Sequence, residues 1–323
     1  MKIALIGYGN VGRALVRLLE SQRPHHPFTL AGIHTARHGT AYDVAGLPPD
    51  SKFGPSAVST EEFLARARAL VAVEVTPLSP STGEPASSHI RAAFAQNMHV
   101  VTANKGPIAH AYQSLREDAS AAGVEFRFES TVMDGAPVFN MVRHCLPNTR
   151  ILGFAGVLNS TSKVVIETME QGGTYEEGVA AARRLGITEA DASYDTEGWD
   201  SAAKAAALAN VFLDAGVAPQ AASPRGITRL TPGRVQELAR QGKTVRLVSR
   251  ARRAGDGVKI RVRAEVLDKN DVLASVPGTS NLLLLHTDLM GTIGAVSISP
   301  GVEQTAYGIF SDLVDIARTV GRI

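Results

Sequence analysis

The 323-residue sequence contains a single cysteine, Cys145, and no long apolar run. One cysteine excludes a disulfide within the chain and a metal cluster held by several cysteines, and such usage is typical of a reducing compartment. The N-terminus has one lysine before a short apolar segment, and nothing there is long enough for a signal peptide or a membrane-spanning helix. We therefore expect a cytoplasmic protein that is not processed at its N-terminus.

The sequence also lacks an excess of charge of either sign. It has 33 Lys and Arg against 31 Asp and Glu, which gives a formal net charge of +2. No basic patch indicates nucleic acid, and no charged run indicates a membrane surface. The composition therefore favours small soluble partners, and the length allows two domains, each with its own core.

Three glycines in the first twelve residues have the spacing of a dinucleotide-binding turn. A short apolar strand precedes them and an amphipathic helix follows over 11–19. The first glycine permits the tight turn, the second lets the backbone approach a diphosphate, and the third allows close packing of the helix on the strand. The N–H groups at the helix start would point at the phosphates. The residues expected to hold the cofactor here are Gly7, Gly9, Asn10, Val11 and Gly12.

Short apolar segments alternate with helical segments over residues 1–130, which predicts a Rossmann-type, doubly wound parallel sheet of the α/β class. The later expected strands are 28–33, 69–75, 98–102 and 124–129, and the later helices are 61–68, 88–96 and 107–122. We expect these residues to form a dinucleotide-binding domain that a closing helix within 303–323 completes.

The pattern changes after residue 130, and residues 131–302 are expected to form an α+β domain for substrate binding and dimerisation. Its expected strands are 151–158, 281–287 and 292–299, its helices are 160–171, 175–185 and 200–213, and a hairpin covers 245–267. Alternating apolar residues in that hairpin indicate a sheet with one buried face.

The end of the second expected strand bears on the choice of cofactor. An acidic residue there would bind the ribose 2′-hydroxyl of NAD, but the sequence runs His34-Thr-Ala-Arg37-His38 without a carboxylate. Arg37 could pair with the 2′-phosphate of NADP, because a guanidinium binds phosphate through two hydrogen bonds. The sequence thus favours NADP over NAD, with a solvated loop arginine as the alternative interpretation.

Polar residues follow the third and fourth strands, at the sheet edge where ligands of open α/β sheets bind. These residues, expected near the nicotinamide, are Thr76, Thr102, Asn104 and Lys105. A lysine there can polarise a carbonyl group, although a surface lysine at the end of a loop is the simpler interpretation.

An acid-rich segment runs from Glu189 to Lys204. Asp200 and Lys204 are four residues apart on an expected helix and therefore share one face. A lysine beside a carboxylate in a cleft can donate a proton to a developing alkoxide, while the other acids bind an ammonium group. An exposed helix pair, worth only about a few tenths of a kcal/mol, is the alternative.

Together these segments resemble homoserine dehydrogenase in its short form, without a C-terminal regulatory domain. The resemblance covers nearly the whole chain and rests on the segments 7–12, 102–105, 129–137, 158–161, 189–204 and 301–306. It implies an NAD(P)-dependent enzyme that interconverts L-homoserine and L-aspartate 4-semialdehyde, in the biosynthesis of threonine and methionine. It also implies a homodimer.

The resemblance assigns roles to several residues. Lys105 and Lys204 would be catalytic, with Lys204 as the proton donor, while Glu189 and Asp200 would bind or orient the amino acid. Gly301 would lie near the cofactor. The family also has a monovalent cation held largely by backbone carbonyls, which maps to Glu129, Val132, Asp134 and Ala136.

Four residues depart from the family pattern, namely Met133, Asp134, Lys163 and Ala192. Lys163 replaces the usual asparagine, and an added cation close to the amino-acid site could pair with a substrate carboxylate or indicate a different substrate. A dehydrogenase of another small hydroxy or amino acid is therefore a second hypothesis. A catalytically silent dinucleotide sensor is a third, and the retained lysines and acids argue against it.

Overall fold

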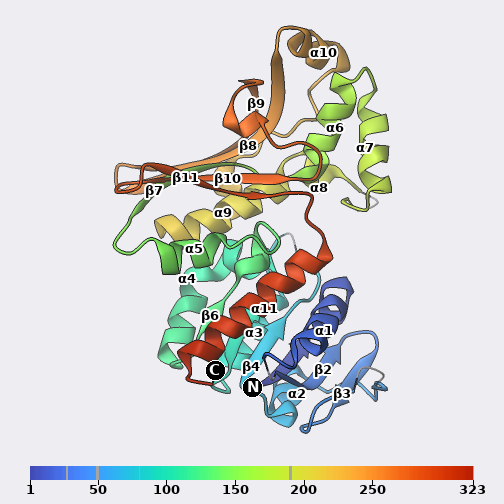
Figure 1. Ribbon diagram of the computed structural model, residues 1–323, viewed down its shortest axis with the longest axis vertical. Coiled ribbons are helices and arrows are strands. Elements are labelled where there is room, and N and C mark those ends of the chain that lie inside the picture. Colours follow the sequence, from blue (N-terminus) through green and yellow to red (C-terminus); the bar gives the residue numbers. More distant parts are fainter. Residues whose placement is uncertain (27, 49–50, 80, 189–190, 323) are drawn as a thin grey trace. The chain divides into compact units, whose positions relative to one another are not determined.

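The computed structural model describes residues 1–26, 28–48, 51–79, 81–188 and 191–322 (Figure 1). Two compact units divide the chain: the first comprises Met1–Arg143 and Gly301–Ile323, and the second comprises His144–Pro300. The last segment therefore returns to the first unit. No helix among the described residues has the length and apolar character needed to span a membrane.

The first unit contains a six-stranded sheet in the order β3-β2-β1-β4-β5-β6. All neighbouring strands are parallel except β2 and β3, which are antiparallel. This arrangement confirms the predicted α/β fold of Rossmann type. The strands are β1 (Lys2–Ile6), β2 (Thr29–Thr35), β3 (Gly39–Tyr42), β4 (Val71–Glu74), β5 (His99–Thr102) and β6 (Phe126–Arg127).

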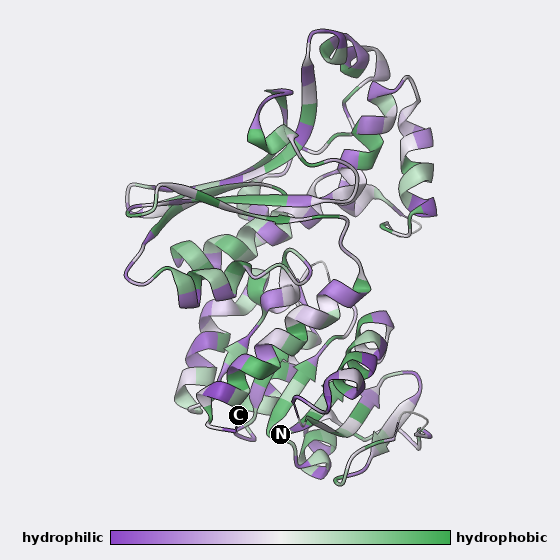
Figure 2. Ribbon diagram, in the orientation of Figure 1, coloured by the Kyte–Doolittle hydropathy of each residue, from purple (hydrophilic) through white to green (hydrophobic). Residues whose placement is uncertain are grey.

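The central strands are mainly hydrophobic (Figure 2), and the residues of β4 and β5 are all buried. Parallel strands covered on both faces have such continuous apolar patterns. The helices of this unit are α1 (Asn10–Gln22), α2 (Thr60–Ala67), α3 (Ala86–Phe94), α4 (Lys105–Ala121), α5 (Val138–Cys145), which extends past the unit boundary, and α11 (Val302–Thr319). One core joins Leu5 of β1, Leu15 of α1 and Leu313 of α11, all fully buried.

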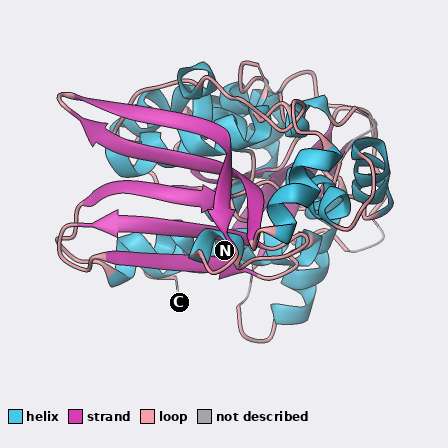
Figure 3. Cartoon of the chain, turned by 90° about the horizontal axis from the view of Figure 1, so that it is seen from above, coloured by secondary structure: helices cyan, strands magenta, loops and turns pink. Residues whose placement is uncertain are grey.

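The second unit contains a five-stranded antiparallel sheet in the order β11-β10-β7-β8-β9, seen from above in Figure 3. Its strands are β7 (Ile151–Val157), β8 (Lys243–Ala254), β9 (Gly257–Asp268), β10 (Asn281–Thr287) and β11 (Thr292–Ser297). Its helices are α6 (Ser160–Glu170), α7 (Tyr175–Arg184), α8 (Ser193–Thr196), α9 (Trp199–Leu213) and α10 (Pro232–Arg240). The alanine-rich α9 packs against the sheet, and most of its residues are buried.

Several described elements differ from the sequence-based expectation, and three of them bear on the argument. The expected loop after β2 is a hairpin to the antiparallel edge strand β3, so the sheet is not wholly parallel. The strand expected at 124–129 is only Phe126–Arg127, because the chain turns into a 3₁₀ helix at Glu129–Thr131. Helix α10 was not expected, although Thr231 accepts a hydrogen bond from the N–H of Arg234 and Pro232 occupies the first turn.

Candidate active site

The glycine turn between β1 and α1 has the shape that a diphosphate requires. Gly7 has a φ of +101°, and a Cβ on it would lie 2.6 Å from the carbonyl oxygen of Val75. A Cβ on Gly12 would lie 2.8 Å from the carbonyl oxygen of Gly7, whereas a Cβ on Gly9 would meet nothing within 4 Å. No side chain caps α1, whose N-cap residue is Gly9. The N-terminus of α1 can therefore bind a phosphate group of a dinucleotide.

Arg37 lies in the turn of the β2–β3 hairpin and is exposed. The hydroxyl of Thr35, the last residue of β2, accepts a hydrogen bond of 2.8 Å from the N–H of His38 and so supports this turn. No carboxylate lies in the hairpin segment 29–42. The position is suitable for a 2′-phosphate, and binding of that group by Arg37 stays a prediction.

The carboxyl ends of β4 and β5 are joined by a buried carboxylate. Glu74 is 1% exposed and accepts hydrogen bonds from the N–H and the hydroxyl of Thr76, the former at 3.0 Å. It also accepts one from the hydroxyl of Thr102 at 2.9 Å. Both threonines predicted to lie near the nicotinamide thus donate hydrogen bonds to Glu74, a residue that the sequence analysis did not select.

Asn104 extends this network to the helix that begins with Lys105. The backbone N–H of Asn104 donates to the Thr102 hydroxyl at 3.0 Å. The side-chain oxygen of Asn104 accepts from the N–H of Gly106 at 3.0 Å. It thereby caps α4, as Asn commonly does. Lys105 is the first residue of α4 and is half-buried.

The acid-rich segment forms a buried cluster around the start of α9. The ammonium of Lys204 lies 3.1 Å from the Asp200 carboxylate and donates to the carbonyl oxygen of Leu158 at 2.6 Å. Both side chains are largely buried, at 17% and 9% exposure. The spacing of four residues therefore brings them together as expected, and the pair is not an exposed helix pair.

Asn159 and Asp195 complete this cluster. The side-chain amide of Asn159 donates to Asp195 at 2.7 Å and to Asp200 at 3.0 Å. Asp195 also accepts from the hydroxyls of Thr161 and Thr188, at 3.1 and 3.0 Å. Burial and then the neighbouring Asp200 raise the pKa of Asp195. Three donors thus converge on one half-buried carboxylate beside the lysine–aspartate pair.

Glu189, the other residue expected to bind substrate, lies outside the described residues. Gly301, expected near the cofactor, is the N-cap residue of α11, and its N–H donates to the Gln304 side chain at 2.9 Å. The first unit therefore carries the candidate cofactor residues, and the second unit carries an acid–lysine cluster.

Two family comparisons identify the chain. A model of homoserine dehydrogenase matches residues 137–314, and a model of the homoserine dehydrogenase NAD-binding domain matches residues 7–129. The chain belongs to the homoserine dehydrogenase family. The resemblance stated from the motifs is thereby confirmed, and the chain is an oxidoreductase that acts on a CH–OH group with NAD(P).

Individual relatives agree with this membership. An NAD(+)-dependent homoserine dehydrogenase of Pseudomonas canavaninivorans is 32% identical over 99% of this chain and 97% of its own length. A homoserine dehydrogenase of Methanocaldococcus jannaschii is 32% identical over 98% of each chain. Among solved structures, a homoserine dehydrogenase of Thiobacillus denitrificans is 28% identical and has a TM-score of 0.84, over 99% of this chain and 74% of that one.

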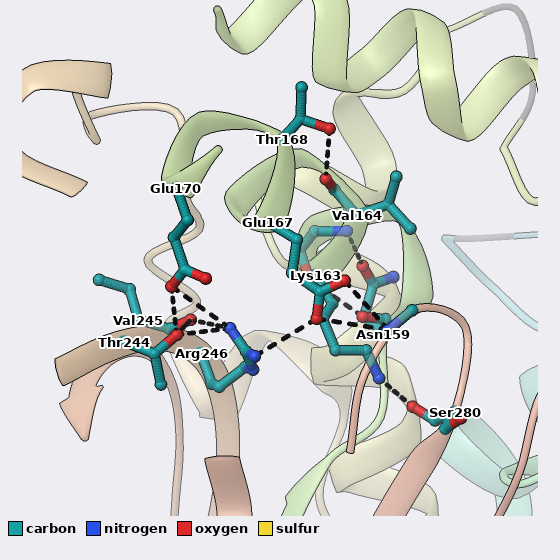
Figure 4. A network of polar contacts seen from close by, with 12 residues as sticks. Asn159, Lys163, Val164, Glu167, Thr168, Glu170, Thr244, Val245, Arg246 and Ser280 are labelled. Atoms are coloured by element: carbon teal, nitrogen blue, oxygen red, sulfur yellow. Dashed lines mark hydrogen bonds and ion pairs between the residues drawn. The ribbon is translucent and has the colours of Figure 1, made fainter. Parts of the chain in front are cut away.

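Lys163 distinguishes this chain from the homoserine dehydrogenase pattern, and its side chain is buried in the second unit (Figure 4). Its ammonium donates to the carbonyl oxygen of Ser280. Nearby, Glu167 accepts from the N–H of Gly278 at 3.0 Å and pairs with Arg246 at 3.3 Å. Burial lowers the pKa of Lys163 to about 8, although Glu167 opposes this shift. Lys163 thus links α6 to the segment before β10 through a hydrogen bond.

The residues predicted from the family resemblance to ligate a cation share one short segment after β6: Glu129, Val132, Asp134 and Ala136. The Glu129 carboxylate accepts from the N–H groups of Phe139 and Asn140, at 2.8 and 2.6 Å. Burial and Asp312 raise its pKa to about 7. The side chain of Glu129 is thus engaged with α5. The cation itself stays a prediction.

Sequence reasoning did not select Glu74, and it included Asp195 and Asn159 only as members of the segments 189–204 and 158–161. Glu74 is the last residue of an otherwise apolar strand, at the sheet edge where ligands bind. A charged residue at the end of such a strand is a signal that could have identified it. Asp195 belongs to the acid-rich segment, and Asn159 is the N-cap residue of α6 after β7. Their partners are 28, 34 and 41 residues away in sequence, so only the fold shows which contacts they make.

Proposed function

We propose that this chain interconverts L-homoserine and L-aspartate 4-semialdehyde, with Lys204 as the proton donor for the reduction. The observation that carries this proposal is the largely buried Lys204 ammonium, held 3.1 Å from Asp200 and 2.6 Å from the Leu158 carbonyl oxygen. A lysine fixed in this way keeps its proton directed at one position and can deliver it to an oxygen that becomes negatively charged.

The chemistry needs a hydride and a proton. A nicotinamide cofactor, held at the turn of Gly7, Gly9 and Gly12, would supply the hydride for the reduction and would accept it in the oxidation. Lys204 transfers its proton to the carbonyl oxygen as the C–H bond forms, and takes a proton from the hydroxyl in the oxidation. Lys105 stabilises the charge on the same oxygen, and Glu189 with Asp200 holds the α-ammonium group of the amino acid.

Asp195 and Asn159 support this arrangement. Asn159 donates to both carboxylates, at 2.7 and 3.0 Å, and therefore fixes Asp200 relative to Asp195. Asp200 is then oriented between the amide of Asn159 and the ammonium of Lys204. We propose that this fixed carboxylate is the part of the site that recognises an amino acid rather than a simple hydroxy acid.

For the cofactor we propose NADP in preference to NAD. Arg37 is exposed in the β2–β3 turn, and the hairpin offers no carboxylate to a ribose 2′-hydroxyl. The Pseudomonas relative is described as NAD(+)-dependent, so NAD is the alternative to be compared directly. We further propose a cytoplasmic homodimer, and a monovalent cation held by the carbonyls of the segment 129–136.

Initial rates test the proposed reaction. L-Homoserine with NADP should produce reduced cofactor at a higher kcat/KM than with NAD, while a panel of other small hydroxy and amino acids should react far more slowly. Light scattering on the same preparation measures the oligomeric state. A faster reaction with another member of the panel would overturn the substrate assignment, and a faster reaction with NAD would overturn the cofactor assignment.

A further inference from the structure

Glu74 is a buried carboxylate that no lysine or arginine among the described residues pairs with. It is 1% exposed. Its nearest basic group is His89, whose Nδ1 lies 3.8 Å away, beyond hydrogen-bond distance. A buried carboxylate without a cation is costly unless hydrogen bonds or a ligand compensate for it.

The pairing of β4 with β1 places Glu74 beside the glycine turn, because Glu74 lies opposite Ile6. The next residue, Val75, donates its N–H to the Ile6 carbonyl at 2.8 Å, and its own carbonyl oxygen is what a Cβ on Gly7 would meet at 2.6 Å. Glu74 therefore ends its strand directly next to the glycine turn that begins the cofactor site. All of these residues belong to the first unit.

The hydrogen bonds to Glu74 also determine which further hydrogen bonds the hydroxyls of Thr76 and Thr102 can make. The hydroxyls of Thr76 and Thr102 both donate to Glu74, so each has only acceptor capacity left. The hydroxyl of Thr102 already accepts from the N–H of Asn104. Thr76, which is half-buried, can therefore accept a hydrogen bond from an amide N–H group, such as that of a carboxamide.

We propose that Glu74 is a positioning residue for the nicotinamide end of the cofactor, and that its buried charge makes the site favour the oxidised, cationic form. This inference rests on the proposed function, because it requires a nicotinamide at the carboxyl ends of β4 and β5. The oxidised ring carries a positive charge that the reduced ring lacks. The carboxylate therefore stabilises one form and leaves the other nearly unaffected.

The test compares dissociation constants of the oxidised and reduced cofactor for the purified protein, by calorimetric and fluorescence titration without substrate. Glu74→Gln keeps the shape of the side chain and removes its charge. A unit charge within about 10 Å, acting through an effective dielectric constant of about 20, changes an affinity by roughly tenfold. We therefore expect the ratio of the oxidised to the reduced dissociation constant to rise roughly tenfold in E74Q.

Control variants separate charge from shape. Glu117→Gln removes an exposed carboxylate from α4 of the same unit and should leave the ratio unchanged. Thr76→Val removes a hydrogen bond but keeps the charge of Glu74, so it should weaken both forms to a similar extent. If E74Q does not fold, Glu74→Met replaces it in the same assay, because an apolar side chain of similar size can substitute for a buried charge.

The outcomes distinguish this inference from the proposed function. An unchanged ratio of the two dissociation constants in E74Q, or a rise of the same size in T76V, would overturn the role assigned to the charge. The proposed function would stand in either case if the wild type still turned over homoserine. A wild-type protein that bound neither cofactor form would instead overturn the proposed function.

Discussion

The ammonium of Lys163 makes the stability of the second unit depend on pH in a way that one substitution can remove. Burial lowers the pKa of this side chain from 10.5 to about 8 in the folded chain. Between these two values the unfolded chain binds more protons than the folded chain, so raising the pH favours the folded state. The stability of this unit should therefore increase from pH 7 to pH 9.5, relative to a variant without this lysine.

The size of the effect follows from the two pKa values. The difference between 10.5 and about 8 corresponds to roughly 3 kcal/mol of unfolding free energy. About 2 kcal/mol of this should be gained between pH 7 and pH 9.5, because the unfolded chain is still mostly protonated at the upper limit. In Lys163→Met the gain should disappear, since methionine has a similar size and does not titrate.

Urea unfolding followed by tryptophan fluorescence provides the assay. Trp199, the only tryptophan in the sequence, begins α9 in the second unit and reports on that unit. Lys259→Met, an exposed position on β9, is the matched control and should retain the wild-type pH dependence. Equal pH dependence in K163M and the wild type would refute the argument that burial lowers the pKa of this lysine.

Three further substitutions test other parts of the site. Gly7→Ala should destabilise the first unit by about 2 kcal/mol or more, because of its positive φ and a contact of 2.6 Å, and calorimetric unfolding should also show no stabilisation by cofactor. Arg37→Ala should reduce kcat/KM for NADP at least about tenfold and leave that for NAD nearly unchanged, and an equal loss with both would contradict the 2′-phosphate role. Asp195→Asn should raise the KM for homoserine with little change in the cofactor dissociation constant, because an amide cannot accept from Asn159, Thr161 and Thr188 together. Loss of cofactor affinity in that variant would assign Asp195 a different role.

The parallel core of the first unit could be predicted because its signals are local. Gly7, Gly9 and Gly12 follow a short apolar strand, and the structure shows why side chains are excluded at two of these positions. The spacing of Asp200 and Lys204 likewise predicted their contact, since residues four apart on a helix are neighbours. Sequence spacing therefore predicts a contact between two residues when both lie on the same helix.

The β2–β3 hairpin shows where local signals fail. Strand β3 is short, and its residues Gly39–Tyr42 carry no run of β-branched side chains that would mark a strand. It is stabilised by pairing with β2 and by contacts such as the hydrogen bond between His34 and Thr40. Helix α10 was missed because its sequence is mostly polar, although Thr231 and Pro232 before it are signals of a helix start.

The contacts that the sequence could not predict join distant parts of the chain. Glu74 is a charged residue in a buried strand, and only the adjacent β5 shows that Thr102 donates to it. Lys163 could be recognised as a departure from the family pattern, but its contact with Ser280 lies 117 residues away. Sequence alone therefore identified the unusual residue and left its partner undetermined.

The most direct test of the proposed mechanism is the turnover of Lys204→Met with L-homoserine and NADP, measured together with cofactor binding. The proposal predicts a loss of kcat of at least about a thousandfold, because this substitution removes the proton donor, with a cofactor dissociation constant close to that of the wild type. Wild-type turnover in this variant would contradict the assignment of Lys204 as the proton donor.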